Sequence, residues 1–497
     1  MRAKKLLSVL TEFDKCGEFE DFKILGLSID SRKTGRDFCF IAIKGTATDG
    51  HDYIAAAIDK GARIIICDED QRDKIKGIGK NKNIVCLGVK NPRIAAAKMA
   101  AEFFGQPNKK LKITGITGTN GKTTVSFLLD HIFSASQHKG GIIGTIYYKI
   151  ADHIISAKNT TPDAITIWNL LYNMVAHDLE YCFMEVSSHA LDQLRTEGID
   201  FTHAVFTNIT QDHLDYHRDL EDYFIAKAKL FQGLLSHRYA VINSDDAYSK
   251  RLRKMTKANI IDYAIKDKQA KIRAENIRLG INGTEFTLVA SDANIKIKTS
   301  IIGRYNVYNI LAAVSVAIIE GIKPPVIAAA LASFACPPGR LEQLIINRPF
   351  KVFVDYAHTD DALKNVLGAL RELKPSRIIT VFGCGGNRDK KKRPLMGAVA
   401  AELSDFLVIT SDNPRNEDPE VIIDNIIAGI PAWFTEYSQI TDRKKAIEKA
   451  LNSASSGDFV LIAGKGHETS QTFMDKTIEF DDKKIALEIL NKEASSK

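Results

Sequence analysis

Short apolar runs alternate with amphipathic stretches over the first hundred residues. DFCFIAI (37–43) and NIVCLGV (83–89) have the composition of buried strands, and NPRIAAAKMAAEFF (91–104) has the apolar spacing of a helix. Between them, YIAAAIDKGARIIICD (53–68) joins a helical pattern to a further strand. The pattern predicts a small α/β domain that ends at the polar linker GQPNKK (105–110).

Strand and helix patterns keep alternating to about residue 332. FACPPGRLEQ (334–343) then interrupts them with two prolines and a glycine, and a third α/β segment follows. We therefore predict three domains, covering residues 1–106, 107–334 and 335–497. The strand patterns of the last domain are KVFVDYA (351–357), RIITVFG (377–383), DFLVIT (405–410) and FVLIAG (459–464).

Apolar strands of this kind are typical of parallel sheets covered by helices on both faces. We expect an α/β protein with a small N-terminal α/β domain, a central domain of the P-loop ATPase type with a parallel or mixed sheet, and a C-terminal Rossmann-like domain. Ligands of such sheets bind beyond the carboxyl ends of the strands. The loops after the strands are therefore where functional residues are expected.

The composition narrows the class of protein. Of 497 residues, 45% are hydrophobic and 26% charged, which is typical of soluble globular chains. The net charge of +7 comes from Lys and Arg spread along the sequence, which favours small anionic substrates over nucleic acid. No apolar span reaches about 18 residues, and the start MRAKKLLSVLTEF lacks the features of a signal peptide. We expect a cytoplasmic protein that has no nucleic-acid or membrane partner.

The cysteines support the same compartment. There are seven of them, dispersed mostly within apolar runs and without a CxxC pair, so we expect reduced thiols in the core. They are Cys16, Cys39, Cys67, Cys86, Cys182, Cys336 and Cys384.

The segment TGTNGKTT (117–124) lies between a strand pattern and a helix pattern. Glycines allow main-chain N–H groups to close around phosphate oxygens at the positive end of the helix. Lys122 would reach the β- and γ-phosphates, and the Thr123 hydroxyl would bind Mg²⁺. Ile116 stands where the strict pattern has its first glycine, and a simple Gly-rich turn is the alternative. The predicted ATP-binding loop comprises Gly118, Thr119, Asn120, Gly121, Lys122, Thr123 and Thr124.

Eleven further segments, in order along almost the whole chain, resemble the Mur ligase family, the ATP-dependent amino-acid-adding enzymes of peptidoglycan synthesis. The set is most similar to members that add meso-2,6-diaminopimelate to UDP-MurNAc-L-Ala-D-Glu. The segments are SIDSR (28–32), NTTPDA (159–164), MEVSSHALDQLR (184–195), TNITQDHLDYH (207–217), YFIAKAKLF (223–231), GRYNVYN (303–309), PPGRLE (337–342), VDYAH (354–358), GCGGNRDKKKRPLMG (383–397), SDNPR (411–415) and GKGHE (464–468).

The resemblance implies an acyl-phosphate reaction driven by ATP, with two Mg²⁺ ions. It implies that Lys122, Glu185, His213 and Lys227 are catalytic, and that Thr123, Glu185, His213 and Lys227 hold the metal, the last as a carbamate formed with CO₂. From the residues alone, His213 could be a capping or buried polar histidine. Likewise Lys227, and Lys229 two positions on, could be surface charges.

For ATP, the resemblance implies that Asn309, Asp355 and His358 hold the adenine and ribose, and that Arg340 reaches the phosphates. An ordinary interdomain salt bridge is the alternative for Arg340. Asp360 stands where the family usually has proline in the segment DYAHTDDAL (355–363).

For the UDP substrate, the resemblance implies Ser31 as a uridine contact. Its usual His-Gln companion is absent from GTATDG (45–50). Hydroxyl, amide and guanidinium groups are suitable donors to anionic oxygens. From the residues alone, NTTP could be a Ser/Thr-rich turn and SSH a helix cap. The implied contacts to the pyrophosphate, sugar and peptide are Asn159, Thr160, Thr161, Ser187, Gln193 and Arg195.

SDNPRNEDP (411–419) alone would be a Pro-broken acidic turn. Within the resemblance it selects the amino acid, because the guanidinium of Arg415 matches the distal carboxylate that diaminopimelate has and lysine lacks. We expect the acids around Arg415 to hold its guanidinium. Asn387 replaces the usual aspartate beside Arg388. The implied amino-acid-binding residues are Arg388, Asp412, Asn413, Pro414, Arg415, Gly464 and Glu468.

Other functions remain open at this point. A lysine-adding ligase of the same family would differ in the amino acid that it takes. A two-domain folylpolyglutamate synthetase, a kinase of small molecules and a non-enzymatic ATP-binding regulator are further alternatives. We expect a monomeric ligase acting on ATP, the UDP-muramoyl dipeptide and diaminopimelate.

Overall fold

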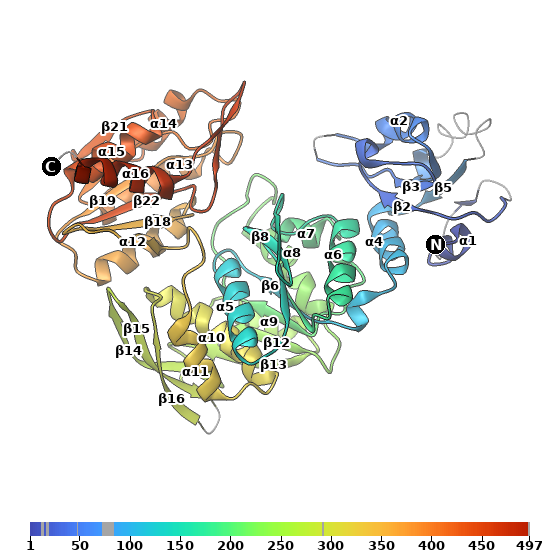
Figure 1. The fold of residues 1–497 in the computed structure, drawn as a ribbon, viewed down its shortest axis with the longest axis horizontal. Coiled ribbons are helices and arrows are strands. Elements are labelled where there is room, and N and C mark those ends of the chain that lie inside the picture. Colours follow the sequence, from blue (N-terminus) through green and yellow to red (C-terminus); the bar gives the residue numbers. More distant parts are fainter. Residues whose placement is uncertain (11–13, 16–18, 47, 72–83, 291–292, 496–497) are drawn as a thin grey trace. The chain divides into compact units, whose positions relative to one another are not determined.

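The computed structural model describes residues 1–497 except 11–13, 16–18, 47, 72–83, 291–292 and 496–497, so Cys16 and Ala47 lie outside the described residues. The chain divides into two compact units (Figure 1). The first comprises Met1–Gly115, Gln137–Ala204 and Lys229–Arg238, and the second Ile116–Ser136, Val205–Ala228 and Tyr239–Lys497. β6 (Lys112–Thr117), β11 (His203–Phe206) and α8 (Leu220–Gln232) contribute residues to both units.

The first hundred residues of the first unit form a five-stranded sheet in the order β1-β5-β4-β3-β2. β1 runs antiparallel to β5, and the other pairs are parallel. Phe40, Ile54, Ile58 and Ile65 pack in its core, as the apolar runs predicted. The elements are α1 (Ala3–Leu7), β1 (Asp14–Lys15), β2 (Gly26–Ser28), η1 (Ser31–Lys33), β3 (Phe38–Ile41), η2 (Gly50–Tyr53), α2 (Ile54–Asp59), β4 (Ala62–Asp68), η3 (Glu69–Gln71), β5 (Val85–Val89), α4 (Pro92–Phe103) and η4 (Pro107–Lys109).

The rest of the first unit is built around a buried strand that ends at Glu185. This strand, β10, runs parallel to β7, which continues antiparallel into β8 and β9. Helix α6 packs against α4. The elements are β7 (Gly140–Ile143), β8 (Tyr147–Ile150), β9 (His153–Ser156), α6 (Ala164–Ala176), β10 (Tyr181–Glu185) and α7 (Ser188–Asp192).

The second unit begins with the nucleotide loop and α5. Its strands β12, β13 and β14 are parallel, whereas β14, β15 and β16 are antiparallel. Helices α10 and α11 pack beside α5 (Figure 1). The elements are α5 (Lys122–Ala135), β12 (Tyr239–Asn243), α9 (Ser249–Met255), β13 (Asn259–Ala264), β14 (Ile272–Gly280), β15 (Gly283–Ala290), β16 (Ala293–Thr299), α10 (Arg304–Ile319) and α11 (Pro324–Ser333).

The expected alternation of strands and helices up to residue 332 is therefore wrong over residues 272–299. Gly280 pairs directly with Gly283, so a two-residue turn reverses the chain, and such a short turn permits only antiparallel pairing. Buried and more exposed positions alternate along much of β14 and β15, as in strands with one covered face.

The last part of the second unit is a Rossmann-like sheet in the order β17-β18-β22-β19-β20-β21, parallel except for β17. Apolar residues of α12, α13 and α14 cover one face, and those of α15 and α16 cover the other. The elements are β17 (Glu342–Gln343), β18 (Lys351–Asp355), α12 (Asp360–Glu372), β19 (Ile378–Phe382), α13 (Lys392–Leu403), β20 (Phe406–Ile409), α14 (Pro419–Ile427), β21 (Tyr437–Gln439), α15 (Arg443–Ser453), β22 (Phe459–Ala463), β23 (Ser470–Thr472), β24 (Thr477–Glu479) and α16 (Asp482–Ser495).

The α/β fold class and its central and Rossmann-like sheets agree with the prediction. All six cysteines in the described residues are free thiols, and all but Cys336 are buried. Among the helices of the described segments, none has both the length and the apolar character needed to cross a membrane.

Candidate active site

The nucleotide loop owes its shape to two glycines. β6 ends at Thr117 and α5 begins at Lys122. Gly118 has φ +151° and Gly121 has φ +91°, which side chains rarely adopt. A Cβ atom on Gly118 would overlap the hydroxyl of Thr207, and one on Gly121 would overlap the Asn309 amide. Both backbone conformation and space therefore require glycine.

The segment TNIT (207–210) holds this loop in place. The main-chain oxygen of Asn208 accepts the N–H of Thr119 at 2.9 Å, and its side-chain oxygen accepts the N–H of Asn120 at 3.0 Å. The Thr207 hydroxyl donates to the Asn120 carbonyl at 2.6 Å. The loop is thus organised by long-range contacts before any phosphate binds.

Two lysine amines meet at the Gly118 carbonyl. Lys122 donates to it at 2.7 Å and to the Thr119 carbonyl at 2.7 Å, and Lys227 donates to it at 2.9 Å. Lys227 is only 2% exposed, so its interpretation as a surface charge is wrong. Burial, and then the charge of Lys122, holds the pKa of Lys227 well below its usual value. By contrast, Lys229 is partly exposed and pairs with Asp192 at 2.9 Å.

His213 lies next to a carboxylate that the sequence analysis missed. It has a left-handed φ of +56°, and its Nε2 is 3.4 Å from Asp212. Burial acts to raise the pKa of Asp212, but its electrostatic interactions with His213, His358, Lys392 and Lys122 outweigh burial, so this pKa lies below its usual value. The aspartate directly before His213 in QDHLDYH is the sequence feature from which this neighbour could have been predicted.

Arg340 reaches the nucleotide loop from the third domain. Its Nη2 donates to the Thr123 hydroxyl at 3.1 Å, and its guanidinium lies 4.7 Å from the centre of the Tyr356 ring. Asp355, at the end of β18, accepts the N–H groups of Leu341 at 2.5 Å and Ala357 at 2.7 Å. Burial raises the pKa of Asp355 to about 6, although Arg340 acts to lower it.

His358 and Asn309 also belong to this unit of the structure. His358 Nδ1 is 2.8 Å from the Tyr356 carbonyl, and the Lys392 amine donates to the His358 carbonyl at 2.8 Å. Burial, and then Lys392, lowers the pKa of His358 to about 4. Asn309 donates to Asn306 at 2.9 Å and lies against Gly121.

Asp361 is a second residue that sequence reasoning missed. Its Oδ2 accepts bonds from Asn120 at 2.8 Å and Thr210 at 2.9 Å, so the start of α12 touches both the nucleotide loop and the segment that supports it. Asp361 could have been predicted from its position in DYAHTDDAL, directly after Asp360, which stands where the family usually has proline. The second unit therefore brings together the nucleotide loop, Lys227, Arg340 and the VDYAH segment.

In the first unit, Glu185 is fully buried at the end of β10. Its carboxylate accepts the N–H of Thr145 at 2.9 Å and the Thr145 hydroxyl at 2.8 Å. The Thr145 hydroxyl also lies 3.1 Å from that of Thr160. A Cβ atom on Gly144 would overlap the carboxylate, so the glycine makes room for it. The contact of Thr145 with Glu185 was not predicted from the sequence.

The predicted substrate residues Thr161, Ser187, Gln193 and Arg195 gather near this strand end. Thr161 donates to the Glu185 carbonyl at 2.8 Å and accepts the N–H of Ser187 at 3.0 Å. Arg195 donates to the Thr161 carbonyl at 2.7 Å and to Gln193 at 2.7 Å.

The local alternatives are partly confirmed. Ser187 does cap α7, since its hydroxyl accepts the N–H of Ala190 at 3.2 Å. The Asn159 carbonyl accepts the Tyr148 hydroxyl at 2.8 Å. Ser31 is buried at the start of η1, the short helix between β2 and β3.

The loops GCGGNRD and SDNPR interlock in the third domain. Arg415 has φ +53°, and its Nη1 donates to the Gly386 carbonyl at 2.8 Å. A Cβ atom on Gly385 would lie 2.9 Å from this Nη1, and one on Gly386 would overlap the Pro414 carbonyl. The two glycines thus allow the close approach that fixes Arg415.

Asn413 joins SDNPR to GKGHE. Its amide nitrogen donates to Glu468 at 2.8 Å, and its amide oxygen accepts the Lys465 amine at 3.2 Å. Lys465 is fully buried and also bonds Glu468 at 3.1 Å. Gly464 has φ +115°, and a Cβ on it would lie 2.7 Å from the Asp412 carboxylate.

The acids that follow Arg415 hold the loop rather than its guanidinium, contrary to expectation. Glu417 accepts the N–H of Asn387 at 2.6 Å and pairs with Arg393 at 3.0 Å. Asp418 caps α14. Arg393 is fully buried. It was not predicted, because it follows three lysines in a run whose composition is typical of an exposed segment. Arg388, in contrast, is exposed.

Within the described ranges, no three His, Cys, Asp or Glu side chains come together as a group that could hold a metal by themselves. The residues nevertheless fit magnesium bound partly by non-protein oxygens. Glu185 is a buried carboxylate held in one orientation by Thr145, and carboxylate oxygens are the ligands that magnesium prefers.

Three family models match the chain. Residues 116–317 match the Mur ligase middle domain, residues 339–466 the Mur ligase, glutamate ligase domain, and residues 23–104 the Mur ligase family, catalytic domain.

Individual relatives match over nearly the whole chain. The UDP-N-acetylmuramoyl-L-alanyl-D-glutamate–2,6-diaminopimelate ligase of Oceanobacillus iheyensis is 42% identical over 492 residues, covering 98% of each chain. A solved structure of a ligase with this name has 31% identity and a TM-score of 0.66, covering 95% of each chain. Mycobacterium tuberculosis folylpolyglutamate synthase with ADP and AMPPCP covers 75% of this chain and 92% of its own, at 19% identity and a TM-score of 0.61, which is a likeness of fold alone.

Proposed function

The chain belongs to the Mur ligase family, and we propose that it is the ATP-dependent ligase that joins meso-2,6-diaminopimelate to UDP-N-acetylmuramoyl-L-alanyl-D-glutamate. The observation that carries this proposal is 42% identity to a ligase of that name over 98% of both chains. The interlocked loops around Arg415 support the choice of amino acid.

The reaction forms an amide from a carboxylate, which is a poor electrophile. The γ-phosphoryl group of ATP is transferred to the γ-carboxylate of D-glutamate, leaving ADP. The amine then attacks the carbonyl carbon of the acyl phosphate, loses a proton, and expels phosphate. Phosphoryl transfer between anions depends mainly on positioning and on positive charge. Lys122 and Arg340, which both lie at the nucleotide loop, would supply that charge.

For ATP, the proposed contacts extend the nucleotide loop with residues of the same unit. Because the N–H groups of Thr119 and Asn120 already bond Asn208, those at the start of α5, from Lys122 to Thr124, would face the phosphates. Lys122 would exchange its bonds to the loop carbonyls for phosphate oxygens. Asn309, Asp355 and His358 would hold the adenosine.

Two magnesium ions would stabilise the negative charge on the phosphoryl group during its transfer. We propose Thr123, Glu185, His213 and Lys227 as the residues that would supply ligands. For Lys227 the ligand would be a carbamate. The nitrogen lone pair bonds to the carbon of CO₂, an oxygen takes up the negative charge, and the nitrogen releases a proton. The lowered pKa of Lys227 supports this step, because only the neutral amine has a free lone pair.

The substrates would be divided among distinct loops. Ser31 would contact the uridine, while Asn159, Thr160, Thr161, Ser187, Gln193 and Arg195 would contact the pyrophosphate, sugar and peptide. Arg415 and Asn413 would bind the distal end of diaminopimelate, with Gly464 and Glu468 at its amine and carboxylate and Arg388 at the other carboxylate. Lysine lacks the distal carboxylate and would leave Arg415 unpaired, which disfavours it.

We also propose that the ligase works as a monomer in the cytoplasm on these small molecules, with domain boundaries near residues 106 and 334. The test of function is phosphate release from ATP with the UDP-dipeptide and either meso-diaminopimelate or L-lysine. We expect release that requires the dipeptide and is much faster with diaminopimelate. Preference for lysine would establish the lysine-adding alternative. ATP turnover that ignores both substrates would refute a ligase, and binding of ATP without turnover would indicate a regulator.

A further inference from the structure

The hairpin of β23 and β24 carries the Arg415 loop on its edge. Thr472 accepts the N–H of Arg415 at 3.0 Å and donates its own N–H to the Asn413 side chain at 3.0 Å. Arg415 and Phe473 form a parallel bridge. Residues 412–415 therefore lie along β23 like a short third strand.

One side chain of this hairpin supports the loop directly. Gln471 is 3% exposed, and its amide nitrogen donates to the Asp412 carbonyl at 2.6 Å and to the Ser411 hydroxyl at 3.5 Å. It binds the main chain just before the residues proposed to select the amino acid.

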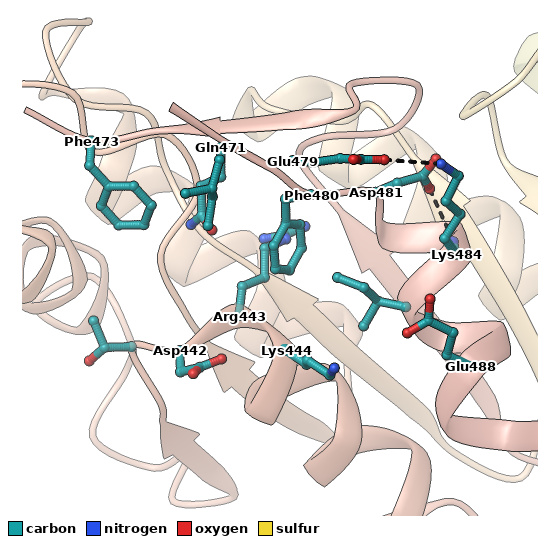
Figure 2. A pocket seen from close by; sticks show the side chains of 13 residues that line it. Asp442, Arg443, Lys444, Gln471, Phe473, Glu479, Phe480, Asp481, Lys484 and Glu488 are labelled. Atoms are coloured by element: carbon teal, nitrogen blue, oxygen red, sulfur yellow. Dashed lines mark hydrogen bonds and ion pairs between the residues drawn. The ribbon is translucent and has the colours of Figure 1, made fainter. Parts of the chain in front are cut away.

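Gln471 also lines a cavity of about 840 Å³. Figure 2 shows it between Phe473 and Phe480, above Arg443. The bond of Gln471 to the Asp412 carbonyl is itself buried, so removal of the amide would leave this carbonyl without that donor. The amide of Gln471 is therefore the contact that fixes the start of the loop, at Ser411 and Asp412.

The loop needs such support because Arg415 has φ +53°, which a residue with a side chain adopts only when its surroundings hold it there. The Gly386 carbonyl holds the tip of its side chain, and Thr472 holds its N–H. Release of Asp412 from Gln471 would free one end of this arrangement.

We propose that Gln471 is a positioning residue for amino-acid selection, which sets the place of the Arg415 guanidinium without touching the substrate. This rests on the proposed function, in which Arg415 pairs with the distal carboxylate. Loss of the Gln471 amide should weaken the binding of diaminopimelate selectively, because lysine has no distal carboxylate to pair with Arg415.

The test compares Gln471→Met, which keeps the size and removes the donor, with the wild type. We expect the KM for meso-diaminopimelate to rise about tenfold, the size of effect that follows from one buried hydrogen bond. The kcat and the KM for ATP should stay within about twofold, because the nucleotide loop is not involved. The ratio of kcat/KM for diaminopimelate to that for L-lysine should fall by the same factor. Glu479→Gln, on the partner strand and in the same cavity, should behave as the wild type.

Gln471→Asn provides a second variant if the first does not fold, since it keeps the amide but shortens its reach, and it should show the same loss. Hydrogen exchange at the Arg415 N–H should accelerate in either variant. An unchanged amino-acid ratio in folded variants would overturn the inference, as would an equal rise in the KM for ATP. If the wild type itself does not use diaminopimelate, the proposed function fails, and the exchange rate at Arg415 still tests whether Gln471 holds the loop.

Discussion

The amine of Lys227 donates a hydrogen bond of 2.9 Å to the carbonyl of Gly118, the first glycine of the nucleotide loop. Its pKa in the folded chain lies well below its usual value of 10.5, because burial disfavours the charged amine. Between these two pKa values the unfolded state binds a proton that the folded state does not. That difference favours the unfolded chain increasingly as the pH falls below 10.5. Lys227 therefore destabilises the protein at neutral pH.

Lys227→Met should raise the melting temperature at pH 7.5 and lower kcat by ~100-fold or more, because an apolar side chain suits the buried site but can form no carbamate. Thermal unfolding and phosphate release measure the two effects. Lys229→Met, on the same helix but partly exposed, should change neither by much. Wild-type activity in the Lys227 variant would contradict the proposed carbamate, as would activity of the wild type that ignores bicarbonate after removal of CO₂.

Replacement of Arg340 should weaken the use of ATP and leave the binding of the amino acid unchanged. Arg340→Lys keeps the charge but loses the planar group that reaches Thr123 and stacks near Tyr356. We expect kcat/KM for ATP to fall roughly 10- to 100-fold, a loss of about 1.4 to 2.7 kcal/mol, while the KM for diaminopimelate stays unchanged. Arg304→Lys, which alters a half-exposed pair with Glu372, serves as the control. A selective loss of diaminopimelate binding would contradict the proposed contact of Arg340 with ATP.

His358 should make the fold sensitive to acid. Burial lowers its pKa to about 4 in the folded chain, against a usual value of 6.5, so between these two values the unfolded chain binds the additional proton. The contribution of His358 to stability is therefore fully present above pH 6.5 and is lost as the pH falls toward 4. The loss amounts to roughly 3 kcal/mol at pH 4.

Asp355 acts in the opposite direction, because its pKa is raised to about 6 and the folded chain takes up its proton first. The difference in unfolding free energy between wild type and His358→Gln isolates the histidine. We expect the difference to shrink or reverse between pH 7 and pH 4.5 in urea titrations. A difference that is constant with pH would show that His358 is not held neutral.

The two glycines at residues 385 and 386 offer a matched pair. Gly386→Ala places a methyl group against the Pro414 carbonyl, which is part of the main chain and cannot easily move away. For Gly385→Ala, the nearest atom to the new methyl group is Nη1 of Arg415, 2.9 Å away, and the end of a side chain can shift more readily. We expect the first to raise the KM for diaminopimelate by ~10-fold or more and to lower stability by ~1–3 kcal/mol. The second should have a smaller effect on both. Steady-state kinetics with diaminopimelate and with ATP check this, and equal effects of the two variants would contradict it.

The sequence was sufficient to locate the nucleotide loop, because the strand, the glycines at positive φ and the helix that starts at Lys122 are local features. The contacts from Thr207 and Asn208 that hold the loop were not evident from the sequence. The apolar runs likewise marked most strands. They did not distinguish the antiparallel strands over residues 272–299, since the direction of pairing depends on a two-residue turn rather than on composition.

What only the tertiary structure decided is which charged groups are buried and what they contact. Lys227 and Lys229 are two positions apart on one helix, yet one is enclosed at the Gly118 carbonyl and the other pairs with Asp192. Asp361 and Gln471 act on loops distant in sequence. Desolvation and charge–charge energies depend on neighbours brought together by folding. The residues of one segment fix its local shape, but the pKa of a side chain and its partners are properties of the folded chain.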